Sequence, residues 1–596
     1  MFASLVFLST VVTLDSHLPP LLPWQGNSVS LMQEKGPLTT DFELSDGTLS
    51  PNYADTMAFV DRLVAANPTQ FKVKTIATSS SGRAIKMLVA NEQGLFEPTQ
   101  LVADTKPTIF VQAGIHSGEI DGKDAMFMLL RDIATGKRRD ILSKVNILFI
   151  PILNVDGHER SSKFNRINQR GPAEMGFRTN GLNLNLNRDY TKLDTPEVQG
   201  VMQVINQFKP DLYIDVHVTD GADYQYDVTY GYNPVFSSES PSVSEALDTL
   251  FKPVIDAKLE KAGHIPGPLV FVMDKRDFKK GLAGWVATPR YSNGWGDLRS
   301  LPSILVENHS LKPYKQRVLG TYVFIDGAID ALAANDKALN AAVKKELDFK
   351  PRQLVVERSY AKQPDTLAFK GIAYSRSESA LTGQAEVKYL GEAKNYESLS
   401  IFWQKDVKKT VHVPRAFYIP PAYSNIIKKL KLHGIDVTQV DNTPTAVMTQ
   451  ASVVDYTFAK APFEGRFRVD AKFDYAPVQV DVRGWYKVST AQPYSELATH
   501  LLHPEAPDSF FSWGEFNTIF QRTEYMENYA LMPYARQMLK EKPALALEFD
   551  QKIREDKQFA NDPEARLNWL YERTPFYDQA YLKYPILMTF ETPEQG

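Results

Sequence analysis

Short apolar runs alternate with helical patterns over residues 50–335 of the chain. Four of these runs are typical of buried strands, at residues 108–113, 145–150, 211–217 and 303–306. Residues 124–133 and a segment from residue 316 to about 334 carry the spacing of helices, and Thr195-Pro196-Glu197 is a typical helix start. Strands that alternate with helices predict an α/β domain with a mixed sheet, which we place at residues 50–340.

The pattern changes after the polar, Lys-rich residues 335–351, where we expect a domain boundary. Residues 466–473 and 478–483 alternate strictly between apolar and polar side chains, as half-buried antiparallel strands do. We therefore predict a β-rich domain over residues 352–490, interrupted by a short helix near residues 424–433. Residues 491–596 are expected to form a mainly helical C-terminal region.

The composition says little about the fold, but it excludes several kinds of site chemistry. The 596 residues exceed one ordinary domain, and their 43% hydrophobic content is normal for a globular protein. A net charge of −4 does not favour nucleic acid as a partner. The absence of cysteine excludes disulfides, thiolate catalysis and cysteine-ligated zinc, so a metal would have to be held by His, Asp or Glu. The sequence does not indicate an oligomeric state.

The N-terminus carries a short apolar run at residues 2–14. It is too short to span a bilayer and resembles a signal-peptide core, although no Lys or Arg precedes it. We expect residues 1–20 to act as an export signal to the periplasm or the cell exterior; the alternatives are a misassigned start or a buried strand, in a cytoplasmic protein. Elsewhere no run approaches ~18 uninterrupted apolar residues, so stable membrane insertion is not expected.

Three residues that follow predicted strands form a candidate metal site. His116 and Glu119 are three positions apart on a glycine-flanked loop directly after residues 108–113, and His217 ends the strand at 211–217. Each alone has an ordinary explanation, but ligand sites gather at strand ends in α/β sheets. Together they make a His₂Glu set with a free fourth position, which is the pattern of a catalytic zinc. Asp215 would lie on the same side of its strand and either orients the site or is an ordinary strand-end acid.

Two further segments carry candidate chemistry. Asn187-Arg188 ends the run FRTNGLNLNLNRDY, which could also be an edge strand with a polar face. A guanidinium beside an amide suits the capture of a carboxylate, such as the C-terminus of a peptide. Glu307 follows the strand at 303–306, and an acid that shares a cleft with zinc can take a proton from water and pass it to a leaving amine.

These elements, in this order, resemble the zinc carboxypeptidase family. His116 and Glu119 match its His-x-x-Glu, and Asn187-Arg188 matches its Asn-Arg pair. Residues 154–157 (NVDG) correspond to its Asn-Pro-Asp-Gly, with Val155 in place of the Pro. His217 resembles its third zinc ligand and Glu307 its general base. The resemblance covers roughly residues 50–335, and the part after residue 350 resembles the extension of large bacterial members.

The resemblance implies one Zn²⁺ per chain, a peptide substrate and further residue roles. Arg178 is expected to polarise the scissile carbonyl, with Arg166 and Arg170 as rivals. Tyr291 is expected to close over the bound C-terminus, with Tyr224, Tyr226 and Tyr230 as rivals. The family commonly has Asn after Asn-Arg, whereas this chain has Asp189, an acid beside Arg188.

Two alternatives to a carboxypeptidase stay open. A zinc amidase or deacylase acting on cell-wall peptides or acylated amino acids would share every metal ligand. A non-catalytic peptide-binding module would have a decayed site, although all three ligands and Glu307 are present. We find no Gly-x-Gly-x-x-Gly, phosphate loop or His-Glu-x-x-His that would support another enzyme class.

Overall fold

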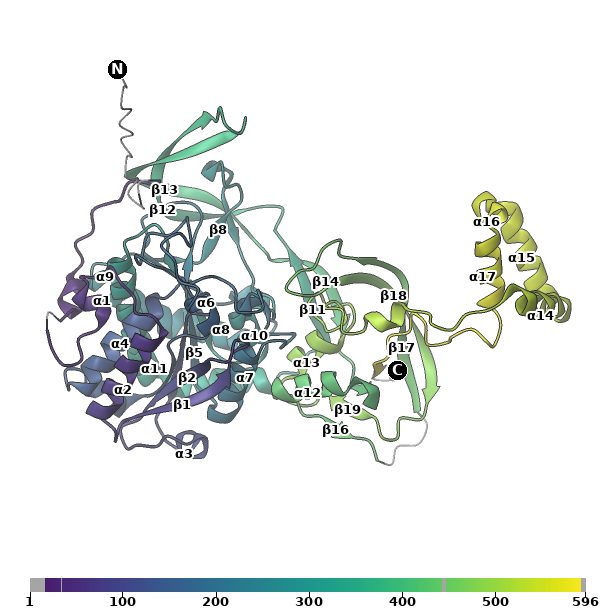
Figure 1. The fold of residues 1–596 in the computed structure, drawn as a ribbon, viewed down its shortest axis with the longest axis horizontal. Helices are drawn as coiled ribbons and strands as arrows, with labels where there is room; N and C mark the ends of the chain where they lie inside the picture. The colour runs from purple at the N-terminus through teal and green to yellow at the C-terminus, as the bar shows by residue number, and fades with distance from the viewer. Residues whose placement is uncertain (1–14, 16, 34, 442–445, 591–596) are drawn as a thin grey trace, which may run out of the picture.

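The computed structural model describes residues 15, 17–33, 35–441 and 446–590 (Figure 1). The predicted export signal lies mostly in residues 1–14, outside the described residues, and stays a prediction. The largest element is an eight-stranded mixed sheet. Its strands, in spatial order, are β1 (Phe71–Thr78), β2 (Ala84–Ala90), β4 (Asn146–Ile150), β3 (Thr108–Ala113), β5 (Leu212–Thr219), β10 (Ser303–His309), β6 (Val228–Gly231) and β7 (Pro266–Pro268).

The central strands of this sheet are parallel. β4, β3, β5 and β10 each run parallel to the next, and antiparallel pairs flank them at β2–β4 and β10–β6. All residues of β3, β4 and β5 are buried, which explains their continuous apolar runs. The predicted α/β fold with a mixed sheet is confirmed, and its four predicted strands are β3, β4, β5 and β10.

Helices cover both faces of the sheet (Figure 1). α2, α4 and α11 lie on one side of the strands, and α7 and α10 lie on the other. Gly122 lets the start of α4 approach the sheet, because a Cβ there would meet the Val216 side chain at 2.8 Å. The helices of this part are α1 (Asp41–Leu44), α2 (Tyr53–Ala66), α3 (Pro98–Val102), α4 (Asp121–Ala134), α5 (Asp140–Lys144), α6 (Val155–His158), α7 (Pro196–Phe208), α8 (Ser242–Ala246), α9 (Lys252–Lys261), α10 (Ser292–Leu298) and α11 (Tyr314–Asp348).

The last of these helices, α11, is longer than expected. It continues through the polar residues that follow Asn335, where the backbone departs from helical angles, and ends at Asp348. Within the described residues it is the one helix long and apolar enough to cross a membrane, but 78% of its most apolar window is buried in the protein. The burial is that of a core helix packed against α4, α8 and α9.

The remainder of the chain is built mainly on three smaller sheets. A four-stranded sheet carries a long hairpin that projects at the top of Figure 1. We call residues 404–441 and 446–590 the second lobe; a six-stranded sheet forms its core, with α12 and α13 nearby. The strands are β12 (Asp365–Glu378), β13 (Ala385–Trp403), β9 (Leu282–Gly284) and β8 (Val270–Val272); β11 (Gln353–Ser359) and β14 (Asp406–His412); and β16 (Thr438–Gln439), β19 (Tyr486–Ser489), β15 (Ala416–Ile419), β20 (Leu587–Thr589), β17 (Ala446–Phe458) and β18 (Val469–Val480).

One pair of predicted strands was wrong. Residues 466–473 and 478–483 contribute to a single strand, β18, rather than to two. Pro477 lies inside it without ending it, because β18 is at the edge of its sheet, where a missing backbone N–H can face away from the partner strand. The predicted short helix is α12 (Ser424–Leu432).

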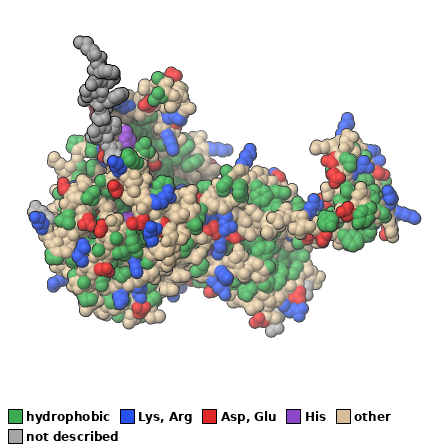
Figure 2. All heavy atoms as spheres, viewed as in Figure 1, with side chains coloured by type: hydrophobic (Ala, Val, Ile, Leu, Met, Phe, Trp, Pro, Cys, Tyr) green, Lys and Arg blue, Asp and Glu red, His purple; other side chains and the backbone are tan. Residues whose placement is uncertain are grey.

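The C-terminal region is helical but not entirely so. α13 (Ser495–Leu502) packs within the second lobe, and β20 returns to pair with β15 and β17. Between them a separate helical arm projects from the molecule (Figure 1). Its helices are α14 (Asn528–Glu541), α15 (Pro543–Glu555), α16 (Lys557–Asn561) and α17 (Pro563–Tyr571). On the face in Figure 2, acidic and basic side chains are interspersed over both lobes and the arm.

Candidate metal centre

Two strand ends bring the three candidate ligands together. Gly114 follows β3 with a φ of 66°, a left-handed conformation that suits glycine, and turns the chain into the loop of His116 and Glu119. His217 lies near the end of β5, the neighbour of β3 in the sheet. The site therefore sits at the carboxyl ends of parallel strands, as expected for a ligand site in such a sheet.

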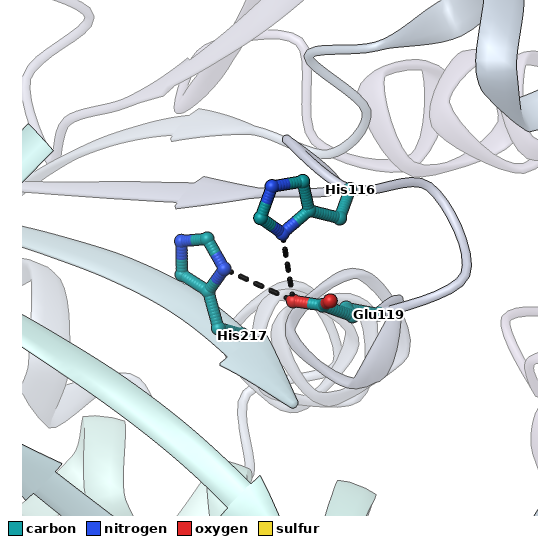
Figure 3. A group of neighbouring side chains, drawn as sticks. All are labelled: His116, Glu119 and His217. Carbon is teal, nitrogen blue, oxygen red and sulfur yellow. Dashed lines mark hydrogen bonds and ion pairs between the residues drawn. The ribbon is translucent and has the colours of Figure 1, made fainter. Parts of the chain in front are cut away.

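The three side chains converge on one point (Figure 3). The Nδ1 atom of His116 lies 3.1 Å from Oε2 of Glu119, and Nδ1 of His217 lies 3.0 Å from the same oxygen. All three residues are at most 3% exposed. Ligands at ~2.0–2.1 Å from a tetrahedral ion lie roughly 3.4 Å apart, so small shifts would seat an ion between them. Among the described residues these three are the one group placed to hold a metal.

Hydrogen bonds behind the histidines fix their orientation. Nε2 of His217 lies 2.8 Å from Oδ2 of Asp215, and Nε2 of His116 lies 2.8 Å from Oδ1 of Asn185. Because an oxygen can only accept, each Nε2 carries a proton and each Nδ1 is left as the ligand atom. Asp215 is itself held by Ser292 Oγ at 2.6 Å and Gln112 Nε2 at 2.9 Å. The structure thus gives Asp215 an orienting contact.

Burial and neighbouring charges set the protonation of the three candidate ligands. Burial lowers the pKa of His116 to about 4, so its ring is neutral. Burial opposes ionisation of Glu119, but the Arg166 guanidinium and the hydrogen bond from His217 hold its pKa well below the usual range. For His217, burial is outweighed by Asp215, and the pKa lies well above the usual value. A cation at Nδ1 of His217 would therefore displace a proton, and binding should be tighter at higher pH.

Glu307 lies beside the three ligands. It is the register partner of His217 in the parallel pair β5–β10, so the two side chains project on the same face of the sheet. Burial raises the pKa of Glu307 to about 8, opposed by His217 and Arg178 and reinforced by Glu119. A carboxyl whose burial makes it a stronger base is thus placed at the edge of the candidate metal centre.

Two of the three candidate arginines reach the site. Arg178 and Arg166 both contact Oε1 of Glu119, at 3.2 Å and 2.9 Å. Arg178 has 45% of its side chain exposed, against 15% for Arg166. Arg170 instead donates to the carbonyls of Leu311 and Pro19, away from the ligands.

The segment of Asn187 and Arg188 forms a short 3₁₀ turn, Leu186–Arg188, rather than an edge strand. Oδ1 of Asn187 accepts from the backbone N of Ser292 at 2.9 Å, and its Nδ2 lies 3.5 Å from Nε2 of His217. The guanidinium of Arg188 stacks 4.2 Å from the ring centre of Tyr291. Asn187, Arg188 and Tyr291 are therefore neighbours next to the ligands, as a carboxylate-binding group would require.

Asp189 turns away from this group. Its carboxylate accepts from Lys192 Nζ at 2.6 Å, and from the backbone N and Oγ1 of Thr195 at 2.9 Å and 2.6 Å. The acid next to Arg188 in the sequence thus fixes the start of α7 and does not pair with Arg188.

The other three candidate tyrosines, Tyr224, Tyr226 and Tyr230, make contacts within the fold. Tyr224 is 6% exposed and stacks on His309 at 4.0 Å. The hydroxyl of Tyr226 accepts from the backbone N of Lys370, and that of Tyr230 donates to Asp256. Of the four candidates, Tyr291 is the one in contact with Arg188.

Sequence reasoning missed Asn185, Ser292 and Glu464. Asn185 carried a signal, since it alternates with Asn183 and Asn187 in the polar run. Ser292 follows Tyr291 directly but has no distinctive spacing. No local sequence pattern marks Glu464, because it contacts Asn185, which is 279 positions away in the chain.

This chain is similar to several known proteins. Residues 56–265 match the family described as zinc carboxypeptidase. Carboxypeptidase 2 of Trichophyton tonsurans is 23% identical over 509 residues, which cover 80% of this chain and 86% of that protein. Carboxypeptidase B of Astacus astacus is 25% identical over 235 residues, 36% of this chain and 73% of that protein. The solved carboxypeptidase A of Helicoverpa armigera has a TM-score of 0.38 and 16% identity, over 52% of this chain and 79% of that chain.

Residues 56–265 therefore match a zinc carboxypeptidase domain, and the curated relatives support metallocarboxypeptidase activity, as the sequence resemblance implied. The matched range includes all three candidate ligands and the Asn187-Arg188 pair, and it ends before Tyr291 and Glu307. The fungal relatives align beyond that range into the second lobe.

Proposed function

We propose that this enzyme removes the C-terminal residue from peptides, using one Zn²⁺ held by His116, Glu119 and His217. The main support is that the Nδ1 atoms of both histidines converge on Glu119. In addition, Glu307 pairs in register with His217. Two imidazoles and a carboxylate are a donor set that suits zinc. Their outward nitrogens are already committed to Asn185 and Asp215, which leaves the inward ones for a metal.

Glu307 is the proposed general base. Zinc in such a site acts as a Lewis acid and lowers the pKa of water. Glu307 then accepts a proton from the attacking water and delivers it to the departing amine. Burial strengthens it as a base, while a nearby divalent charge favours its ionised form.

The basic residues have separate proposed roles. Arg178 polarises the scissile carbonyl, since its guanidinium lies beside Glu119 yet is exposed enough to meet a substrate. Asn187 and Arg188 hold the terminal carboxylate of the peptide. Tyr291, stacked on Arg188, closes over that carboxylate.

The test is a matched substrate panel on zinc-loaded protein. A blocked dipeptide with a free C-terminal carboxylate is compared with its C-terminal amide and with an acylated amino acid, alongside the zinc content. We expect about one zinc per chain and cleavage of the free acid at least tenfold faster than the amide, because only the acid can pair with Arg188. Equal cleavage of the amide would favour the amidase or deacylase, and zinc binding without any hydrolysis would favour the binding module.

Export of the enzyme is also proposed, on the signal-like N-terminus alone. Cleavage near residue 20 in protein recovered from the cell exterior or periplasm would support it, and intact protein confined to the cytoplasm would contradict it.

A further inference from the structure

The second lobe reaches the candidate active site through the loop between β17 and β18. Oε2 of Glu464, in this loop, accepts a hydrogen bond from the backbone N of Asn185 at 2.7 Å. Glu464 adopts a φ of 49°, a left-handed conformation that an L residue rarely takes. Local strain of this kind persists only where the surrounding structure holds it, and here it accompanies the contact to Asn185.

Asn185 relays this contact to the ligands. Its side-chain Oδ1 lies 2.8 Å from Nε2 of His116 and accepts from the backbone N of Asn187 at 3.0 Å. Asn185 also caps the 3₁₀ turn that carries Asn187 and Arg188. Its own backbone N is thus fixed by a carboxylate from the other lobe, a charge-assisted hydrogen bond that is stronger than a neutral one. One residue of the second lobe therefore sets the position of both a ligand and the carboxylate-binding turn.

A second contact joins the second lobe to the segment before Tyr291. Arg290, the residue before Tyr291, lies 2.7 Å from Oδ1 of Asp508, which is 2% exposed. The carbonyl of Arg290 also accepts from the backbone N of Tyr190 at 3.3 Å. Trp513 stacks on Phe463 at 5.9 Å, next to the Arg290 guanidinium. The second lobe therefore also contacts the residue that precedes Tyr291 and fixes its position.

We propose that Glu464 is a positioning residue, through which the second lobe completes the active site. It acts by fixing Asn185, and so the ring of His116 and the turn of Asn187 and Arg188. The substrate part of this inference rests on the proposed carboxypeptidase function, while the part concerning His116 and the turn does not.

A neighbouring network offers a matched control. Lys429 pairs with Asp194 at 2.9 Å and with Glu515, so it joins the same two parts of the molecule without contacting Asn185. If Glu464 served only to hold the lobes together, losing either Glu464 or Lys429 would have the same effect on the site.

The experiment compares Glu464→Ala, Glu464→Gln and Lys429→Met in the full chain. In the Ala variant we expect zinc affinity, measured by chelator competition, to fall roughly 10-fold, the usual scale for a residue that orients a ligand. At saturating zinc, KM for a free-acid peptide should rise about tenfold with kcat nearly unchanged, the pattern of lost substrate binding. The Gln variant keeps an acceptor of the same length and should recover most of both losses.

Hydrogen exchange of residues 182–190 in the zinc-free protein gives a readout independent of activity. Exchange there should speed up in Glu464→Ala but stay at the wild-type rate in Lys429→Met. Wild-type exchange and zinc affinity in Glu464→Ala, or equal losses in Lys429→Met, would overturn the proposal. If wild type binds zinc but cleaves no free-acid peptide, the proposed function fails while zinc affinity and exchange still decide the role of Glu464; if it binds no zinc, exchange alone decides it.

Discussion

At the scale of single residues, the sharpest consequence concerns Glu307. Replacing it with Gln keeps the size of the side chain but removes the basic oxygen, so proton transfer from water is lost. We expect Glu307→Gln to lower kcat by about 10²–10⁴-fold, with zinc content unchanged, since Glu307 is not among the three converging ligands. Steady-state kinetics with zinc analysis of the same sample tests this. Turnover within a few fold of wild type would refute the general-base assignment.

Asp215 is expected to act through the ligand His217 and not on the substrate. Its carboxylate holds Nε2 of His217, so Asp215→Asn weakens the orientation and basicity of that ligand. We expect zinc affinity to fall by about 10–100-fold. Asp220→Asn, the same change at an exposed position past the end of β5, is the control and should bind zinc like wild type. Equal affinities in both variants would make Asp215 an ordinary buried acid.

At the scale of elements, the sequence predicted the strands that have a local apolar pattern. It missed the features that depend on contacts between residues far apart in the chain. The buried runs of β3, β5 and β10 were visible, and placing His116, His217 and Glu307 at their ends followed from the logic of parallel sheets. The pairing of Pro477 within an edge strand was not visible, because edge position is set by the whole sheet. Glu464 was missed for the same reason: its partner Asn185 belongs to another lobe.

The helical arm is an element with its own core. Ala535, Met538, Phe559, Trp569 and Leu570 form a buried cluster whose members all belong to α14, α16 and α17. Replacing residues 524–577 with a short Gly/Ser linker should therefore leave kcat/KM for a dipeptide within about twofold, since no site contact would be lost. Kinetics and zinc content of the shortened chain check this. A loss of either by tenfold or more would show that the arm supports the site.

At the scale of the whole molecule, three carboxyl groups lie where α10, α11 and α13 meet. Burial raises the pKa of Asp297 to about 6. Burial and the neighbouring carboxylates raise the pKa of Glu346 to about 8 and that of Glu496 to about 7. Lys350 opposes the shift of Glu496, and Glu239 reinforces it. Since α11 belongs to the catalytic part and α13 to the second lobe, the protonation of these groups bears on how firmly the two are joined.

The stabilising contribution of these three carboxyl groups should therefore fall as pH rises from about 5 to 8.5. In the unfolded chain these carboxyls titrate near pH ~4, so below that value their contribution is fully present. Above it the folded state binds more protons than the unfolded state, and stability is lost as pH passes each folded pKa. Glu496→Gln removes one such group, so the change in its Tm from pH ~5 to pH ~8.5 should be more positive than the wild-type change by about 2–4 °C. Calorimetry of the zinc-loaded protein across this range measures it, with Glu505→Gln, whose pKa is lowered, as control. The same change of Tm with pH in Glu496→Gln as in wild type would mean that other groups govern the pH response of the junction.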